Sequence, residues 1–161
     1  IPEDRNEEGL CLNLTVRENT MHSAMPYLFR FQFVSKQTEK RLSREIIDKL
    51  SIKTPSTEQI VNYLSGGNKQ KVVLGKWLLQ DQEIFIFDEP TRGIDVGAKA
   101  EFYRIINDLV RDGAAVIMIS SEIPEILTMS DRIYVMRRGR IAASYERSEA
   151  TQEKLLQSAL L

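Results

Sequence analysis

The stretch LSGGN, residues 64–68, followed by IFIFDEPT, residues 84–91, decides the fold of this chain. The first piece is a serine–glycine turn that stands directly before residues 68–80, whose apolar residues have helical spacing. The second piece is an apolar strand that ends in two adjacent carboxylates. In this order, the two pieces predict a turn that faces phosphate and a strand end that carries carboxylate chemistry.

The turn suits phosphate for physical reasons. Glycine at positions 66 and 67 lets a phosphate approach the backbone closely and accepts a positive φ without penalty. Ser65 can cap the helix over 68–80 while its hydroxyl stays available to an oxyanion, and the first N–H groups of that helix then point at the ligand. A serine-capped surface helix is the simpler alternative, and Ser-Gly-Gly alone favours it. The apolar stripe of the helix includes Trp77, which we expect in the core.

The strand makes the phosphate interpretation the better one. Residues 84–87 are apolar without alternation, which is typical of a strand buried on both faces of a parallel sheet. Ligands bind outside the carboxyl ends of such strands, where Asp88 and Glu89 emerge. A helix over 97–111 and a second buried strand over 114–119 follow. This strand–helix–strand order predicts a right-handed parallel crossover.

A phosphate-cradling loop is missing from the sequence. None of the eight glycines stands in a Gly-x-x-x-x-Gly-Lys-Ser/Thr arrangement, which supplies the backbone nest and the lysine for β- and γ-phosphates. The single Gly-Lys pair, Gly75-Lys76, is followed by Trp77. We therefore expect this chain to be inactive as an ATPase alone. The first residue, isoleucine, and the polar segment 1–10 are interpreted as entry midway through a longer domain.

Four stretches resemble the C-terminal cassette of the tandem-cassette ABC ATPases that energise bacterial monosaccharide (ribose/galactose/xylose-type) importers. They are residues 2–5 (PEDR) with Gly9-Leu10, residues 64–78 (LSGGNKQKVVLGKWL), residues 88–99 (DEPTRGIDVGAK) and residues 120–136 (SSEIPEILTMSDRIYVM). The resemblance implies an α/β fold, namely a partial P-loop NTPase (RecA-like) parallel-sheet core with a small helical signature subdomain. It makes residues 1–161 the C-terminal portion of one cassette, with the helical subdomain at about 11–80 and the Walker B half of the core at about 81–161.

The resemblance also implies roles for named residues. The signature turn contacts the γ-phosphate of ATP held by the opposite cassette, and its members are Ser65, Gly66, Gly67 and Asn68, with Gln70 just after them. In the Walker B pair, Asp88 holds Mg²⁺ through a coordinated water and Glu89 is the general base. Asp95 belongs to the D-loop, Gly93–Asp95, which couples the two ATP sites.

Two positions depart from the pattern of the superfamily. Glu3 occupies the place of the Q-loop glutamine, and Ser121 stands where most cassettes carry the switch histidine. The one histidine, His22, is expected to have a surface or packing role. Because the signature turn is intact, we expect this half-cassette to act mainly in trans, completing the site of the N-terminal cassette.

The resemblance implies partners and a location. The partners are the N-terminal cassette of the same protein, transmembrane permease subunits and, indirectly, a sugar-binding protein, at the cytoplasmic face of the bacterial inner membrane. The aromatic segment 26–33 is a candidate permease contact, and core packing explains it equally well. The open edge of strand 114–119 predicts self-association.

Composition sets limits. The 22 basic and 23 acidic residues give a net charge of −1, which does not favour nucleic acid as a partner. No stretch is long enough to span a bilayer. The one cysteine, Cys11, excludes an internal disulfide and is expected to be an inert, partly buried thiol.

Other functions stay open. Related cassettes import nucleosides or signalling molecules. A DNA-repair type ATPase lobe would carry long heptad repeats before the signature turn, and helix 38–50 is too short for that. A non-catalytic assembly module fits the missing phosphate loop but not the retained Glu89.

Overall fold

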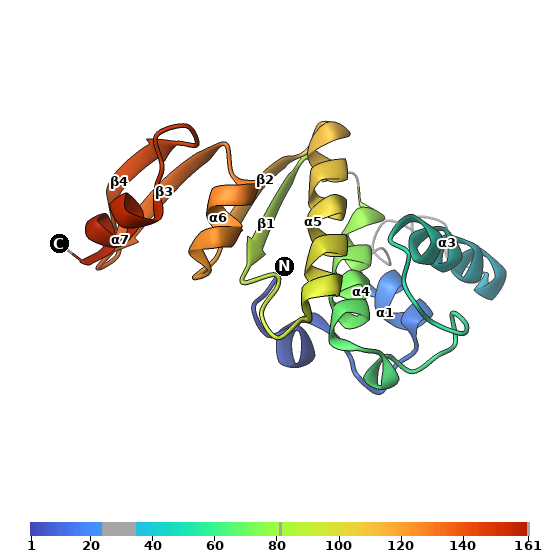
Figure 1. Ribbon diagram of the computed structural model, residues 1–161. Coiled ribbons are helices and arrows are strands. Elements are labelled where there is room, and N and C mark those ends of the chain that lie inside the picture. The colour runs from blue at the N-terminus through green and yellow to red at the C-terminus, as the bar shows by residue number, and fades with distance from the viewer. Residues whose placement is uncertain (24–34, 81, 161) are drawn as a thin grey trace. The chain divides into compact units, whose positions relative to one another are not determined.

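The computed structural model describes residues 1–23, 35–80 and 82–160 (Figure 1). The chain divides into two compact units, Ile1–Ile117 and Met118–Leu161. The predicted aromatic contact at residues 26–33 lies outside the described residues. No helix within the described ranges has both the length and the apolar character that crossing a bilayer requires.

The first unit contains a group of helices and a two-stranded sheet. Its elements are η1 (Arg5–Gly9), α1 (Val16–His22), α3 (Lys36–Lys49), η3 (Val61–Tyr63), α4 (Gly66–Leu78), β1 (Ile84–Asp88), α5 (Val96–Arg111) and β2 (Ala115–Ile119), whose last residues belong to the second unit. The helices predicted over 38–50, 68–80 and 97–111 are confirmed with ends moved by at most two residues. The first unit thus has the predicted strand–helix–strand order.

Helix α4 is the centre of the helical group. It lies between α5 on one side and α1 and α3 on the other (Figure 1). Six consecutive residues of α4, 70–75, are buried, because neighbours surround the helix in its middle. Trp77 is 37 % exposed, so its predicted core position is wrong. The helical stripe that suggested it assumes one covered face, whereas the neighbours of α4 cover the middle of the helix more completely than its end.

Within the first unit, the described residues cover one face of the sheet. Strands β1 and β2 form a parallel pair, and the backbone of Ile1 bonds to the other edge of β1 at Ile86 and Asp88. Phe87 is fully buried and its ring meets Phe102 of α5 edge-on, with centroids 5.9 Å apart. Ile84 and Ile86 are 61 % and 51 % exposed.

The expectation that both strands are buried on both faces is therefore wrong. β1 alternates between buried and exposed residues, and Ile117 of β2 is also more than half exposed. Among the described residues of the first unit, α5 packs on one face through Phe102, and the isoleucine face has no comparable cover. An uninterrupted apolar run cannot reveal which of its faces has a partner.

Charged side chains tie the helices to the segments around the signature turn. Arg17 of α1 is buried and donates hydrogen bonds to Glu58, at 2.9 Å from Nε to Oε1, and to Glu39 of α3. The hydrogen bond from Arg17 lowers the pKa of Glu58. Because Glu58 lies shortly before the turn at Ser65, this network fixes the path of the chain that enters the turn.

The second unit is a hairpin with two helices. Its elements are α6 (Ile123–Met129), the antiparallel strands β3 (Arg132–Arg137) and β4 (Arg140–Glu146), and α7 (Gln152–Leu160). Arg138 and Gly139 join the strands with φ of 49° and 74°, as a type I′ turn requires. Leu155 of α7 packs on the inner face of β3.

Replacing Gly75 with alanine tests the close contact of α3 and α4. A Cβ at Gly75 would lie 2.6 Å from Cγ2 of Ile46, so Gly75→Ala should lower the free energy of unfolding, by about 1–3 kcal/mol as overpacking does. Gly97→Ala is the control, because its Cβ would meet no atom closer than 3.4 Å. Urea unfolding measures both variants, and equal midpoints would show that the helices do not touch at Gly75.

Candidate functional site

The signature turn holds its serine by an unexpected contact. The extended backbone of Ser65, with φ −62° and ψ 159°, makes it the N-cap residue of α4, but its side chain accepts no hydrogen bond from a backbone N–H of the helix. Instead Oγ of Ser65 accepts a hydrogen bond from Nδ2 of Asn68 at 2.8 Å. The predicted side-chain cap is therefore wrong. Because Asn68 donates, the exposed Ser65 hydroxyl keeps its own proton for an acceptor outside the turn.

Asn68 also links the turn to a neighbouring loop. Its Oδ1 accepts a hydrogen bond from the backbone N–H of Lys53 at 2.8 Å. Both ends of the amide are thus used within the chain. In this arrangement Asn68 orients Ser65 and the loop around Lys53.

Packing accounts for the glycines at 66 and 67. Both residues lie in α4, and positive φ among glycines occurs only at Gly93, Gly113 and Gly139 within the described residues. A Cβ at Gly67 would lie 2.7 Å from Cβ of Ala98, on α5. A Cβ at Gly66 would lie 3.0 Å from Nη2 of Arg5 and 3.3 Å from the carbonyl oxygen of Gly93. The structure requires these glycines for the approach of α5 and of the loop before it, and not for a positive φ.

The carboxyl end of β1 carries the predicted acid pair. Asp88 is the last residue of β1, and its backbone N–H donates to the carbonyl of Ile1 at 3.0 Å. Glu89 has φ of 43°, in the left-handed region that non-glycine residues rarely adopt. Such strain costs about 1–3 kcal/mol and is concentrated at functional sites. The backbone therefore leaves the extended conformation of β1 at Glu89.

The acid pair fits magnesium bound together with a phosphate. No group of three or more His, Cys, Asp or Glu side chains among the described residues could hold a metal ion by itself. Mg²⁺ does not need such a group, because it keeps several waters and takes one or two carboxylates plus phosphate oxygens. Asp88 supplies a hard oxygen ligand of this kind, and Glu89 beside it leaves a second carboxylate for a bound water. The donor set thus suits Mg²⁺ with a nucleotide and does not suit a metal held by protein alone.

The loop after the acid pair is held by its own hydrogen bonds. The N–H groups of Arg92 and Ile94 donate to the carbonyls of Glu89 and Thr91, at 3.1 and 3.2 Å. Asp95 then caps α5, because its Oδ1 accepts a hydrogen bond from the N–H of Ala98 at 2.9 Å. The predicted D-loop residue therefore has a structural contact of its own.

The remaining predicted residues lie in different places. Gln70 is 1 % exposed and its Oε1 has no hydrogen-bonding partner among the described residues, so it lies in the core and not at the surface of the turn. Glu3 forms an ion pair with Arg92 of the loop. Ser121 belongs to the second unit and is exposed. His22, at the end of α1, is exposed, and so is Cys11, which corrects its predicted partial burial.

Sequence reasoning missed Arg5. Its Nη1 donates to the carbonyl of Arg92 at 2.8 Å and its Nη2 donates to the carbonyl of Gly93 at 3.2 Å. Arg5 lies in the PEDR stretch, which supported the resemblance, but only Glu3 of that stretch received a role. An arginine beside an acidic residue in a segment without periodicity was the available signal.

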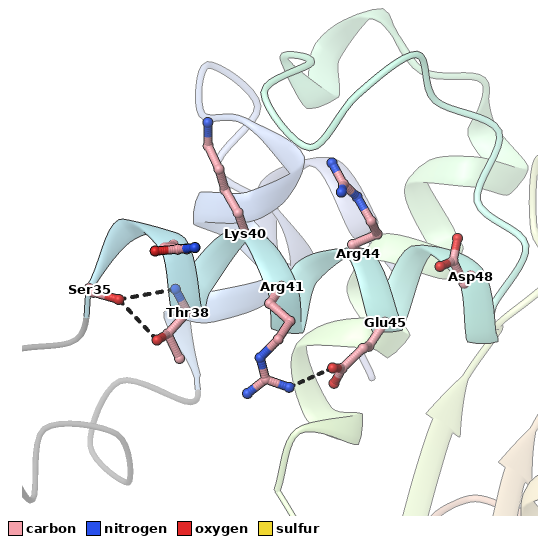
Figure 2. Close-up of a pocket in the computed structure, with 8 residues that line it drawn as sticks. Ser35, Thr38, Lys40, Arg41, Arg44, Glu45 and Asp48 are labelled. Atoms are coloured by element: carbon pink, nitrogen blue, oxygen red, sulfur yellow. Dashed lines mark hydrogen bonds and ion pairs between the residues drawn. The ribbon is translucent and has the colours of Figure 1, made fainter.

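The hollow in Figure 2 is a separate feature. It runs along α3 and is lined by polar and charged side chains of that helix, among them Arg41 and Glu45, which form an ion pair at 2.6 Å. None of the predicted site residues lines it. It is a solvated helix surface and contributes nothing to the acid pair or the turn.

The fold is that of the ATP-binding cassettes, which belong to the P-loop NTPase class. The structure is similar to a dimeric, post-hydrolysis ATP-binding cassette bound to ADP and Pi, with a TM-score of 0.75 and 20 % identity over 91 % of this chain and 61 % of that one. It is also similar to the ADP conformation of an ABC transporter cassette, with a TM-score of 0.71 and 22 % identity over 91 % and 62 % of the two chains. The predicted fold class is confirmed.

Residues 4–92, more than half of the chain, match the model of the ABC transporter family, and the chain belongs to this family. It is 48 % identical over 160 residues to the ribose import ATP-binding protein RbsA of Rhodopirellula baltica, covering 99 % of this chain and 31 % of that protein. It is 49 % identical over 156 residues to the xylose import ATP-binding protein XylG of Moorella thermoacetica, covering 97 % and 31 %. The chain thus spans about a third of the length of these relatives.

Two substitutions of Asp95 separate its capping contact from any further role. Asp95→Ala removes the acceptor for Ala98 N–H and should lower the free energy of unfolding by about 1 kcal/mol, the usual value of an N-cap. Asp95→Asn keeps an oxygen acceptor and should remain near the wild type. Denaturant unfolding measures both. An alanine variant as stable as the wild type would show that the cap contributes nothing.

Proposed function

We propose that this chain is part of the ATP-hydrolysing cassette that powers monosaccharide import through a membrane permease. The observation that carries the proposal is the identity of 48–49 % to ribose and xylose import ATP-binding proteins over nearly the whole chain. Both relatives are named for pentoses, which favours a monosaccharide over the nucleosides or signalling molecules that other cassettes import.

The acid pair at the end of β1 serves the hydrolysis of ATP in this proposal. Asp88 would hold Mg²⁺, and the ion, when bound, would neutralise charge on the phosphates. Glu89 accepts a proton from the water that attacks the γ-phosphate. The left-handed backbone at Glu89 supports this role, because local strain is tolerated where a side chain must be aimed.

The signature turn serves the ATP held by the opposite cassette. The hydroxyl of Ser65 donates to a phosphate oxygen, and the first N–H groups of α4 add the partial positive charge of the helix N-terminus, which favours an anion. Three observations support the assignment. The Ser65 side chain is exposed, and its oxygen accepts a hydrogen bond from Asn68. Glycine at 66 and 67 lets the turn pack against the loop that carries Asp95. Asp95 couples the two sites.

The partners follow from this role. They are an N-terminal cassette that supplies the phosphate-cradling loop, permease subunits, and a sugar-binding protein that acts through the permease. The chain is then peripheral at the cytoplasmic face of the inner membrane. The names of the two relatives, which describe import and ATP binding, support this arrangement.

Calorimetric titration of the chain with Mg-ATP tests the trans assignment. No detectable binding is expected, since the sequence contains no Gly-x-x-x-x-Gly-Lys-Ser/Thr loop to hold the β- and γ-phosphates. Micromolar binding would mean that another phosphate cradle exists in this chain and that Glu3 and Ser121 need different roles.

Two substitutions in the assembled transporter test which residues matter. Ser65→Arg should lower ATP turnover by about 100-fold or more, as the loss of a preorganised donor does, because its side chain also fills the turn. Glu89→Gln should cost less than tenfold, since the departures at Glu3 and Ser121 weaken the site to which it belongs. Ser148→Arg, at an exposed turn of the second unit, is the control. Equal losses from the first two variants would disprove the asymmetry.

A further inference from the structure

We propose that Arg5 is a positioning residue that locks the loop of residues 91–95 to the start of α4. The proposal rests on the proposed function and adds to it a residue that no predicted role covers. The guanidinium is a planar fork, and its two Nη atoms reach the carbonyls of consecutive residues, Arg92 at 2.8 Å and Gly93 at 3.2 Å. Lysine, with one ammonium group, cannot reproduce this pair of contacts in the same geometry.

Gly66 lies at the same point. A Cβ on Gly66 would come within 3.0 Å of Nη2 of Arg5 and within 3.3 Å of the Gly93 carbonyl oxygen. The guanidinium therefore fills the space above Gly66, between α4 and the loop. A side chain at position 66 would push the guanidinium away from the carbonyls. The close contacts with Arg5 and with the Gly93 carbonyl thus favour glycine at position 66 for a reason that involves no ligand.

The other residues of the PEDR stretch support the same contact. Oδ1 of Asp4 accepts hydrogen bonds from the N–H groups of Asn6 and Glu7, at 2.8 and 3.1 Å, and so fixes the start of η1, where Arg5 stands. The carboxylate of Glu3 pairs with the side chain of Arg92. The segment therefore holds the loop at two kinds of atoms. Glu3 binds the side chain of Arg92, and the Arg5 side chain binds the backbone carbonyls of Arg92 and Gly93.

The arrangement includes one unpaired donor. Nε of Arg5 is buried and has no hydrogen-bonding partner within the part of the chain that the structure describes. A buried N–H without an acceptor is unfavourable, and each such group in a native structure needs an explanation. Here, the contacts of the two Nη atoms with the carbonyls hold the guanidinium in a position that leaves Nε buried.

The contact joins two parts of the site. The loop follows Glu89 and leads to Asp95, while Gly66 follows Ser65 directly. Through Arg5 the acid pair of one ATP site and the signature turn of the other become parts of one rigid body. Since Arg5 acts on backbone and not on nucleotide, its loss should change the rate of turnover and leave the KM for ATP nearly unchanged.

A double-substitution cycle tests this inference. The variants are Arg5→Met, Arg5→Lys, Gly66→Ala and Arg5→Met with Gly66→Ala. Arg111→Met is the matched control, because Arg111 is an exposed arginine whose Nη2 donates to Oδ1 of Asp108 at 2.6 Å, on the same helix and away from the loop. Hydrogen exchange of the amides of residues 92–98 is measured on the chain itself, and ATP turnover is measured on the assembled transporter.

The expected results are specific. Arg5→Met and Gly66→Ala each raise exchange in residues 92–98 about tenfold, while exchange in α1 stays unchanged. Each lowers kcat about tenfold with KM within about twofold, and the double variant is no worse than Arg5→Met alone. Arg5→Lys lies between wild type and Arg5→Met.

Two results would overturn the inference. One is exchange at the wild-type rate in Arg5→Met. The other is a Gly66→Ala effect that multiplies with that of Arg5→Met, which would assign the glycine to a ligand. If the wild-type assembly hydrolyses no ATP, the proposed function fails, and the exchange measurements still decide on Arg5.

Discussion

The close approach of α4 and α5 is the constraint on which the rest of the structure depends. The helices meet where Gly67 faces Ala98, and a single added methyl group at Gly67 would lie 2.7 Å from the Ala98 side chain. α4 begins with the signature turn, and α5 begins with the loop that leaves β1 after the acid pair. Because the helices touch near their first turns, their N-terminal ends, and everything attached to them, are fixed side by side.

An ion pair further along the two helices fixes their axial position. Lys71 of α4 is buried, and its Nζ lies 2.8 Å from Oε2 of Glu101 on α5 and 3.1 Å from the carbonyl of Ser51. The hydrogen bond from Lys71 lowers the pKa of Glu101. Only the Lys71 side of this ion pair is buried, since the Glu101 side chain is 37 % exposed, so the pair adds little net stability, but it penalises a shifted register. The pair thus complements the small-residue contact at Gly67, which allows approach without specifying register.

Local patterns in the sequence predicted the elements but not what surrounds them. Helical spacing located α4 and α5, and the apolar run located β1. The same patterns placed Trp77 in the core and buried both faces of the sheet, and both predictions were wrong. Burial depends on which neighbours cover an element, and that is a property of long-range packing. The acid pair was found because its chemistry is local, whereas Arg5 acts on residues nearly ninety positions away.

The glycines of the turn show why a motif does not reveal the force that maintains it. Resemblance assigns Gly66 and Gly67 to a phosphate, yet a Cβ at Gly67 would lie 2.7 Å from Cβ of Ala98 and a Cβ at Gly66 would lie 3.0 Å from Nη2 of Arg5, so each glycine already has a close neighbour inside the chain. Asn68 likewise uses its amide on Ser65 and Lys53. A substitution at these positions would therefore lower activity in either case. If the glycine serves an internal contact, the new side chain displaces α4 and moves Ser65. If the glycine serves a ligand, the new side chain blocks the ligand. The two causes differ in reach: an internal contact propagates to α5 and its loop, whereas a ligand contact leaves the unliganded chain unchanged.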